Sequence, residues 1–206
     1  MDSKKLAAWT RNWSSELLGH DDACCREARN WFSCMAKSHE LHITRGQRLA
    51  GPRWLNRRYQ WGPSSWPLYW CQAATLKTID CGVFSALARE SFRVKGVSAY
   101  AGQVIRQLNP ESVAHFERLW SGRPGTFGWT ADEHVYHEVT VILVKDDSQP
   151  DAPPRALVYD ATDGHWIEPD GERGYGRDVA IRADLSESAT WGRYVLNEQW
   201  VDLHAH

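Results

Sequence analysis

The chain has 206 residues, of which 42% are hydrophobic and 24% are charged, and its formal net charge is −2 at pH 7. This balance is typical of a globular protein with a core of its own, and it excludes an intrinsically disordered chain. It also excludes attraction of nucleic acid or membranes by net charge alone. We therefore predict a single domain spanning residues 1–206.

The N-terminal sequence MDSKKLAAWTRNW is positively charged but lacks the apolar segment of a signal peptide. No apolar run in the chain approaches the roughly 18 residues that a membrane-spanning helix needs. The Cys count of 5 is odd, which does not suggest a disulfide framework. We expect a cytoplasmic protein with no membrane partner.

The N-terminal part of the chain predicts helices followed by an irregular segment. Residues 3–18 and 21–37 have helical patterns, whereas residues 44–70 are rich in Arg, Trp, Gly and Pro. Such a composition is typical of an irregular segment that lies over a domain. We interpret residues 1–70 as a helical and irregular extension, and residues 71–206 as the core.

The rest of the chain predicts one strongly amphipathic helix and a series of strands. Residues 81–94 place apolar side chains on one face at helical spacing, and Gly96 would end the helix. Helices followed by antiparallel strands indicate an α+β domain in which a helix packs on a sheet. The other expected elements are strands over 97–108, 137–144 and 155–162, a short helix over 111–120, and loops over 121–129, 146–154 and 167–178.

Cys81 lies at the predicted start of the helix over 81–94, between an Asp and a Gly. At a helix N-terminus, the dipole and the free N–H groups lower the pKa of a thiol. The backbone N–H of Cys81 would also be free to donate to an oxyanion. These properties favour a nucleophilic thiol, and the alternative is a small side chain in the core.

A thiol nucleophile needs a base, and the base needs an acceptor that fixes its tautomer. His137 begins the strand over 137–144, and Asp160 lies in the returning strand of the expected hairpin. The hairpin would bring these two side chains together. His134 is the alternative base, and Asp163 is the alternative acceptor.

The chain thus contains, in order, a helix that begins at a Cys (TIDCGVFSALA), a strand that follows a Gly (KGVSAYAGQVI), a strand headed by His (HEVTVIL) and a strand that ends in Asp before a turn (LVYDATDG). This order resembles the core of the transglutaminase-like branch of the papain-like cysteine enzyme superfamily, over residues 78–166. The resemblance implies Cys81 as nucleophile, His137 as base and Asp160 as the group that orients the base. It also implies a papain-like core, with the Cys-headed helix packed on an antiparallel sheet.

The resemblance implies acyl transfer through a thioester on Cys81. The acyl donor would be an amide, ester or thioester, free or carried on a protein, and the acceptor would be an amine or water. The 12 Trp residues suggest a dry, aromatic-lined site, which favours an amine, as in amide-forming enzymes of natural-product biosynthesis. The alternatives are a hydrolase or deamidase with the same triad, such as a peptidase or a toxin or effector, and a non-catalytic binding module.

Two further sets of residues are candidates for binding roles. A side chain upstream of Cys81, either Gln72 or Trp70, would supply a second N–H to the oxyanion. Arg interleaved with Trp can dock a phosphate or an acidic protein, and the alternative is a solvated Arg surface over a Trp-rich core. Because the net charge is slightly negative and no known binding motif occurs, we expect no nucleic-acid partner. The docking candidates are Arg53, Arg57, Arg58, Trp61 and Trp66.

Five Cys and His residues near the N-terminus could in principle bind a metal ion. Near the N-terminus, Cys and His residues of the kinds that bind zinc occur as two adjacent cysteines and as a C-x4-H-x2-H sequence. Neither spacing matches a common zinc motif. We expect no metal and no cofactor. The residues concerned are Cys24, Cys25, Cys34, His39 and His42.

Overall fold

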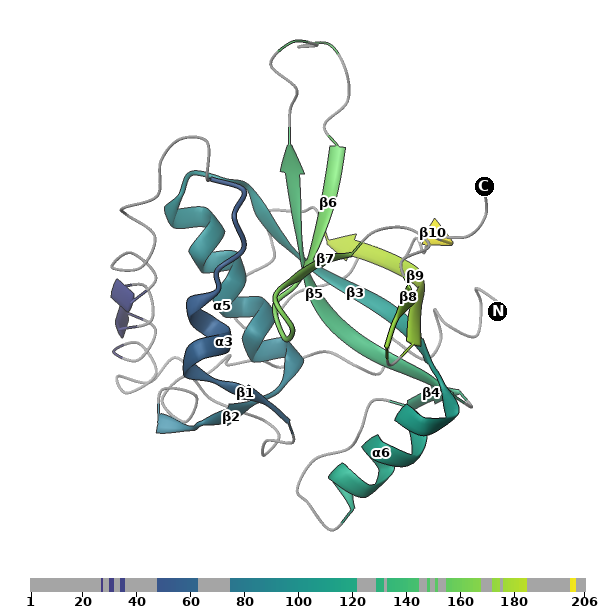
Figure 1. Ribbon diagram of the computed structural model, residues 1–206. Coiled ribbons are helices and arrows are strands. Elements are labelled where there is room, and N and C mark those ends of the chain that lie inside the picture. The colour runs from purple at the N-terminus through teal and green to yellow at the C-terminus, as the bar shows by residue number, and fades with distance from the viewer. Residues whose placement is uncertain are drawn as a thin grey trace.

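A computed structural model describes residues 27, 30, 31, 34, 35, 48–62, 75–121, 129–131, 133–144, 148, 151, 155–167, 172–174, 176–184 and 201–202. Within these residues the fold is α+β, with a helix packed on an antiparallel sheet (Figure 1), which confirms the predicted class. The predicted helix over 3–18 lies outside the described residues. So does the predicted helix over 21–37, apart from single residues that are helical.

The centre of the sheet consists of two long antiparallel strands, β3 (Ala99–Leu108) and β5 (His134–Val144). Their pairing runs without a shift from Ala99 opposite Ile142 to Gln107 opposite His134. β5 therefore begins three residues before the predicted start at 137. This uninterrupted register means that side chains alternate regularly between the two faces of β5.

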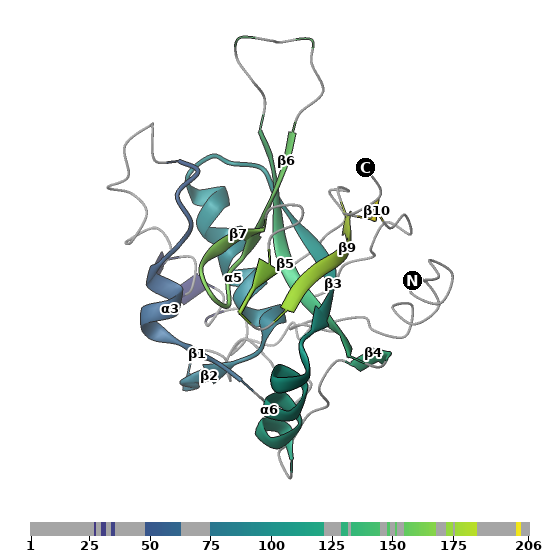
Figure 2. The ribbon, with the colours of Figure 1, turned by 45° about the vertical axis from the view of Figure 1, so that its right-hand side comes forward.

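The remaining strands extend the sheet in the order β10-β9-β3-β5-β6-β7. The predicted loop over 167–178 is partly wrong, because β8 forms a short hairpin with β9 there. Figure 2 brings β9 forward and shows α6 (Pro110–Trp120) below the sheet, at the end of β3. The strands are β4 (Trp129–Ala131), β6 (Arg155–Asp160), β7 (His165–Ile167), β8 (Glu172–Arg173), β9 (Gly176–Asp184) and β10 (Val201–Asp202).

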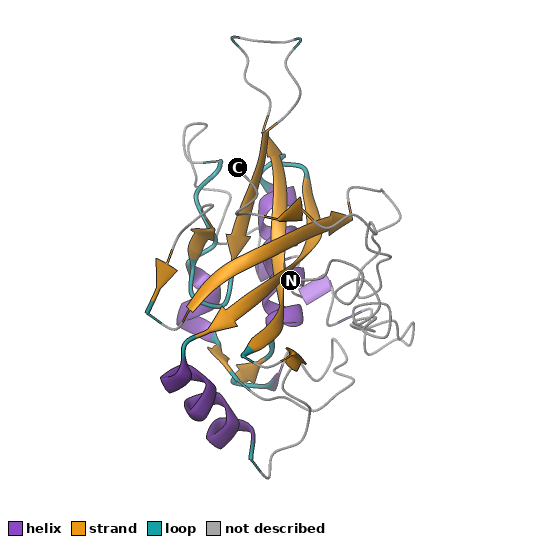
Figure 3. Cartoon of the chain, turned by 90° about the vertical axis from the view of Figure 1, so that its right-hand side faces the viewer, coloured by secondary structure: helices purple, strands orange, loops and turns teal. Residues whose placement is uncertain are grey.

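α5 (Cys81–Val94) has the bounds that the sequence predicts. Asp80 caps its start, because the Asp80 carboxylate accepts a hydrogen bond from the backbone N–H of Val83 at 3.0 Å. The helix covers one face of the sheet (Figure 3). Phe92 packs its edge against the ring of Tyr159, with ring centroids 5.6 Å apart, and both rings are fully buried in the core.

The segment over 44–70, predicted to be irregular, contains a short helix that belongs to the core. This helix is α3 (Trp54–Arg58), and the chain then forms β1 (Gln60–Trp61), which pairs in parallel with β2 (Thr78–Ile79). Trp54 is buried and donates from its indole N–H to the hydroxyl of Ser91 in α5, at 3.1 Å. α3 therefore lies beside α5 as part of the folded body (Figure 1).

Candidate active site

His137 and Asp160, which the sequence pairs as base and orienting group, meet in the structure. The Nε2 atom of His137, on β5, lies 2.9 Å from the Oδ1 atom of Asp160, at the end of β6. His137 is 5% exposed and Asp160 is fully buried. The alternative acceptor, Asp163, instead accepts from the backbone N–H and the ring of His165, both at 3.2 Å. The structure thus places Asp160, and not Asp163, against the imidazole.

Asp160 accepts hydrogen bonds from several donors besides His137. Its Oδ1 also accepts from the backbone N–H of Thr162 at 3.0 Å and from the Thr162 hydroxyl at 2.6 Å, and its Oδ2 accepts from Arg106 at 2.8 Å. Burial alone would raise the pKa of Asp160. The charges of His137 and Arg106, with the hydrogen bonds from His137 and Thr162, nevertheless hold that pKa well below its usual range. Asp160 is therefore an ionised acceptor.

An ionised carboxylate decides which ring nitrogen of His137 bears the proton. Because Asp160 can only accept, the Nε2 atom of neutral His137 must be the donor. The other ring nitrogen, Nδ1, then has a free lone pair. His137 is thus held in the tautomer that can take a proton at Nδ1.

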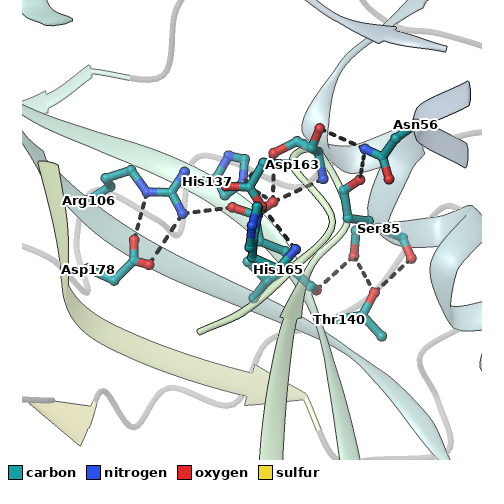
Figure 4. Close-up of polar contacts among 12 residues, drawn as sticks. Asn56, Ser85, Arg106, His137, Thr140, Asp163, His165 and Asp178 are labelled. Atoms are coloured by element: carbon teal, nitrogen blue, oxygen red, sulfur yellow. Dashed lines mark hydrogen bonds and ion pairs between the residues drawn. The ribbon is translucent and has the colours of Figure 1, made fainter. Parts of the chain in front are cut away.

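Arg106 and Asp178 complete this network, and the sequence did not single them out. The two residues are direct partners on β3 and β9. The Nε of Arg106 donates to Oδ1 of Asp178 at 2.7 Å, and its Nη2 reaches Oδ2 at 3.3 Å. Figure 4 shows Arg106 between Asp178 and the side chains around His137. The signal in the sequence was a single charged residue, Arg106, in an otherwise uncharged strand, but Asp178 fell in a predicted loop.

Cys81 is partly exposed at the first position of α5. Its pKa is raised well above the ordinary value, first by burial and then by the carboxylates of Glu138, Asp80 and, to a lesser extent, Asp160. A hydrogen bond from the backbone of Glu138 lowers it only in part. The expectation that the helix N-terminus would give a low pKa is therefore wrong, because burial and nearby negative charge outweigh the helix dipole. At neutral pH this thiol is protonated.

Contacts between α5 and β5 fix which face of the sheet each side chain of β5 occupies. The hydroxyl of Ser85 donates to the carbonyl of Val139 at 2.7 Å, and the hydroxyl of Thr140 donates to the carbonyl of Ser85 at 3.0 Å (Figure 4). Thr140 thus faces α5. By alternation Glu138 shares that face, as does His134, whereas His137 lies on the opposite face.

One short stretch of β5 is not paired on its outer edge by the described strands. On the edge away from β3, β4 pairs with His134 and Val135, and β6 pairs with Thr140 and the residues after it. Between them lie residues 136–139, the edge segment, which neither β4 nor β6 reaches in the described part of the chain. The Glu138 backbone that hydrogen-bonds to Cys81 belongs to this segment. Cys81 therefore contacts the segment of β5 that carries His137.

The remaining candidate residues from the sequence are Gln72, Trp70, Trp61, Trp66 and three Arg side chains. Gln72, Trp70 and Trp66 lie outside the described residues. Trp61 is half-buried and packs its ring against Phe116 of α6, with centroids 5.4 Å apart. Three Arg side chains are exposed at α3 and its N-terminal flank: Arg53, Arg57 and Arg58.

Arg58 shows what this Arg surface contacts within the protein. Its guanidinium lies over the ring of Trp31, 4.7 Å from the centroid, and over the ring of Tyr59 at 5.2 Å. The exposed Arg58 side chain thus lies against aromatic rings through cation–π contacts. Of the five zinc-ligand candidates only Cys34 is described, and it is exposed.

Comparison with known proteins yields no match to a family model, a curated protein or a solved structure. Within the described ranges, no three His, Cys, Asp or Glu side chains are grouped so that they could hold a metal ion. None of the described helices is long and apolar enough to cross a membrane.

Proposed function

We propose that the protein is a cysteine-dependent acyltransferase of transglutaminase-like type, which forms an amide through a thioester on Cys81. The observation that supports this most directly is the bond between His137 and the ionised Asp160. A thiol nucleophile needs a base, and an imidazole serves when a carboxylate orients it and its second ring nitrogen is unprotonated. The proposal includes a papain-like core, with the Cys-headed helix packed on the sheet.

The raised pKa of Cys81 shapes the first step of this mechanism. Because the thiol is protonated at rest, Nδ1 of His137 takes the proton from Sγ as the sulfur attacks the acyl carbon. The new C–S bond gives a tetrahedral oxyanion, which the backbone N–H of Cys81 at the start of α5 stabilises. The intermediate collapses when the leaving group departs with the proton from His137, and the thioester remains.

The second step reverses these roles. An amine attacks the thioester carbon and gives a proton to Nδ1 of His137. The C–S bond then breaks, and the sulfur recovers that proton. The carboxylates of Glu138, Asp80 and Asp160, whose charge acts on Cys81, also attract an ammonium group, which supports an amine acceptor over water.

Mass spectrometry of the intact protein tests this proposal. The full chain is incubated with a panel of acyl thioesters, esters and amides, and Cys81→Ala serves as the control. The expected result is an acyl adduct on Cys81 that disappears on addition of an amine, with release of the amide. An adduct that is lost equally fast to water would identify a hydrolase, and no adduct with any donor would leave a non-catalytic binding module.

A further inference from the structure

Arg106 links the carboxylate behind His137 to a third strand of the sheet. Its Nη2 atom lies 2.8 Å from Oδ2 of Asp160, and its Nε lies 2.7 Å from Oδ1 of Asp178. All three side chains are buried, with 8% or less of the Arg106 side chain exposed. A buried guanidinium that bridges two carboxylates in this way holds both in fixed orientations.

The positive charge of Arg106 offsets the negative charges of the two carboxylates in this buried cluster. Two buried carboxylates, Asp160 and Asp178, share one guanidinium. Without that cation, two negative charges would face each other in a medium of low dielectric, and one of them would take up a proton. The groups that face Asp160 include His137 from β5, Arg106 from β3 and Thr162 from the turn after β6, and the charge of Asp160 also acts on Cys81 of α5.

We propose that Arg106, held in place by Asp178, is a positioning residue that keeps Asp160 ionised and so fixes His137 with its proton on Nε2. This inference rests on the proposed function, in which Nδ1 of His137 is the base. A protonated Asp160 could donate to Nε2 instead of accepting from it. The imidazole proton would then move to Nδ1, and His137 could no longer take a proton from Cys81.

Nitrogen NMR of the full chain measures this tautomer directly. Protein with ¹⁵N-labelled His is studied near pH 7.5 by long-range proton–nitrogen correlation, and the signals that vanish in His137→Gln identify His137. We expect the wild type to have its proton on Nε2. Arg106→Gln should shift His137 towards the Nδ1-protonated form, whereas Arg106→Lys, which keeps the charge, should retain most of the wild-type pattern.

Arg177 provides a matched control on the same pair of strands. Its guanidinium donates to the Gln107 side chain at 3.1 and 3.2 Å, so it also joins β9 to β3, but it is exposed and makes no contact with Asp160. Arg177→Gln should leave the His137 signals unchanged. A purely structural role for Arg106 would disturb folding without reversing the tautomer.

The inference is overturned if folded Arg106→Gln protein keeps the Nε2-protonated tautomer. Should that variant fail to fold, the double variant Arg106→Gln/Asp178→Asn removes one charge of each sign and leaves the net charge of the cluster unchanged. Because the cation that offsets the burial of Asp160 is still missing, this variant should also shift towards Nδ1, though by less than Arg106→Gln. Retention of the wild-type tautomer there would also overturn the inference.

Acylation kinetics separate this inference from the proposed function. We expect Arg106→Gln to form the Cys81 adduct about a hundredfold more slowly than the wild type at neutral pH, and Arg106→Lys to recover part of that loss. If the wild type forms no adduct but the tautomer still depends on Arg106, the function fails and the positioning role stands. If the adduct forms while neither its rate nor the tautomer responds to Arg106→Gln, the function stands and the positioning role fails.

Discussion

Thr162 donates two hydrogen bonds to one oxygen of Asp160, from its backbone N–H at 3.0 Å and from its hydroxyl at 2.6 Å. That oxygen, Oδ1, is the one that lies against His137. A side chain that bonds the backbone two residues later is a common way to close a turn. The carboxylate is therefore oriented by its own turn as well as by β5 and β3.

Replacement of Asp160 by Asn should reduce stability in a pH-dependent way. Because the pKa of Asp160 is lowered in the folded state, its contribution is complete above the unfolded value of about 3.9 and is lost as the pH falls through the lower folded value. We expect Asp160→Asn to cost about 3 kcal/mol near pH 7, and the difference from wild type to shrink below about pH 4. Urea unfolding across this range measures it.

Asp163→Asn is the control for that experiment, because Asp163 lies on the same turn, is partly exposed and pairs with the exposed His165. It should change the unfolding free energy by less than about 1 kcal/mol. If the cost of Asp160→Asn stayed constant from pH 7 to pH 3, Asp160 would not be an ionised group in the folded protein.

Alkylation of Cys81 should be slow at neutral pH and should accelerate at high pH. The raised pKa leaves little thiolate below the ordinary thiol value of about 8.5. Among the negative charges that raise the pKa of Cys81, that of Glu138 has the largest effect, so Glu138→Gln should speed the reaction at pH 8. Glu117→Gln, on the exposed face of α6, should not. Iodoacetamide labelling with the site mapped by mass spectrometry tests both, and rapid labelling of wild-type Cys81 at pH 6 would contradict the raised pKa.

The two histidines of β5 should differ sharply in their effect on acylation. His137→Ala removes the imidazole that Asp160 orients, and we expect a loss of about 10²–10⁴-fold in the rate of adduct formation. His134→Ala should cost far less, because His134 lies on the opposite face of β5 from His137. The measurement is the time course of Cys81 acylation. A larger loss in His134→Ala would transfer the role of base to the histidine on the α5 face.

Two neighbouring glycines should differ in their tolerance of a side chain. Gly176 has φ of 150°, and an added Cβ would press against the backbone carbonyl of Gln107, whereas an added Cβ at Gly174 would meet nothing nearby. Gly176→Ala should lower the unfolding free energy by about 1–3 kcal/mol, and Gly174→Ala should leave it almost unchanged. If the two variants had equal midpoints in thermal unfolding, the start of β9 would not lie against the backbone of Gln107 as the structure places it.

Local patterns in the sequence were sufficient for the central elements of the fold. The cap at Asp80 and the apolar spacing after it give α5 its bounds, and alternation gives β3 and most of β5. Alternation missed the first three residues of β5 because His134 and Tyr136 are polar enough to resemble a loop. β9 depends on its pairing with β3, and the two-residue β8 on its pairing with β9, and such long-range pairing leaves no local signature.

The candidate site was predictable only where its residues follow one another in a hairpin. His137 and Asp160 come from adjacent strands, so a hairpin was enough to pair them. Arg106 and Asp178 come from strands that are distant in sequence, and the ion pair between them has no periodic pattern. The expected low pKa of a thiol at a helix N-terminus was wrong for a similar reason. The charges that raise the pKa of Cys81 include those of Glu138 on β5 and Asp160 on β6, which are distant in sequence.

The turn that holds Asp160 also depends on the part of the chain that precedes Cys81. The Asn56 side chain, on α3, donates to the carbonyls of Ala161 and Thr162 at 3.0 and 2.9 Å. Gly51 lies so close to the ring of Tyr159 that a Cβ there would clash with it. A protein shortened to residues 71–206 would therefore retain every residue of the proposed triad and yet lose the clamp that sets its geometry.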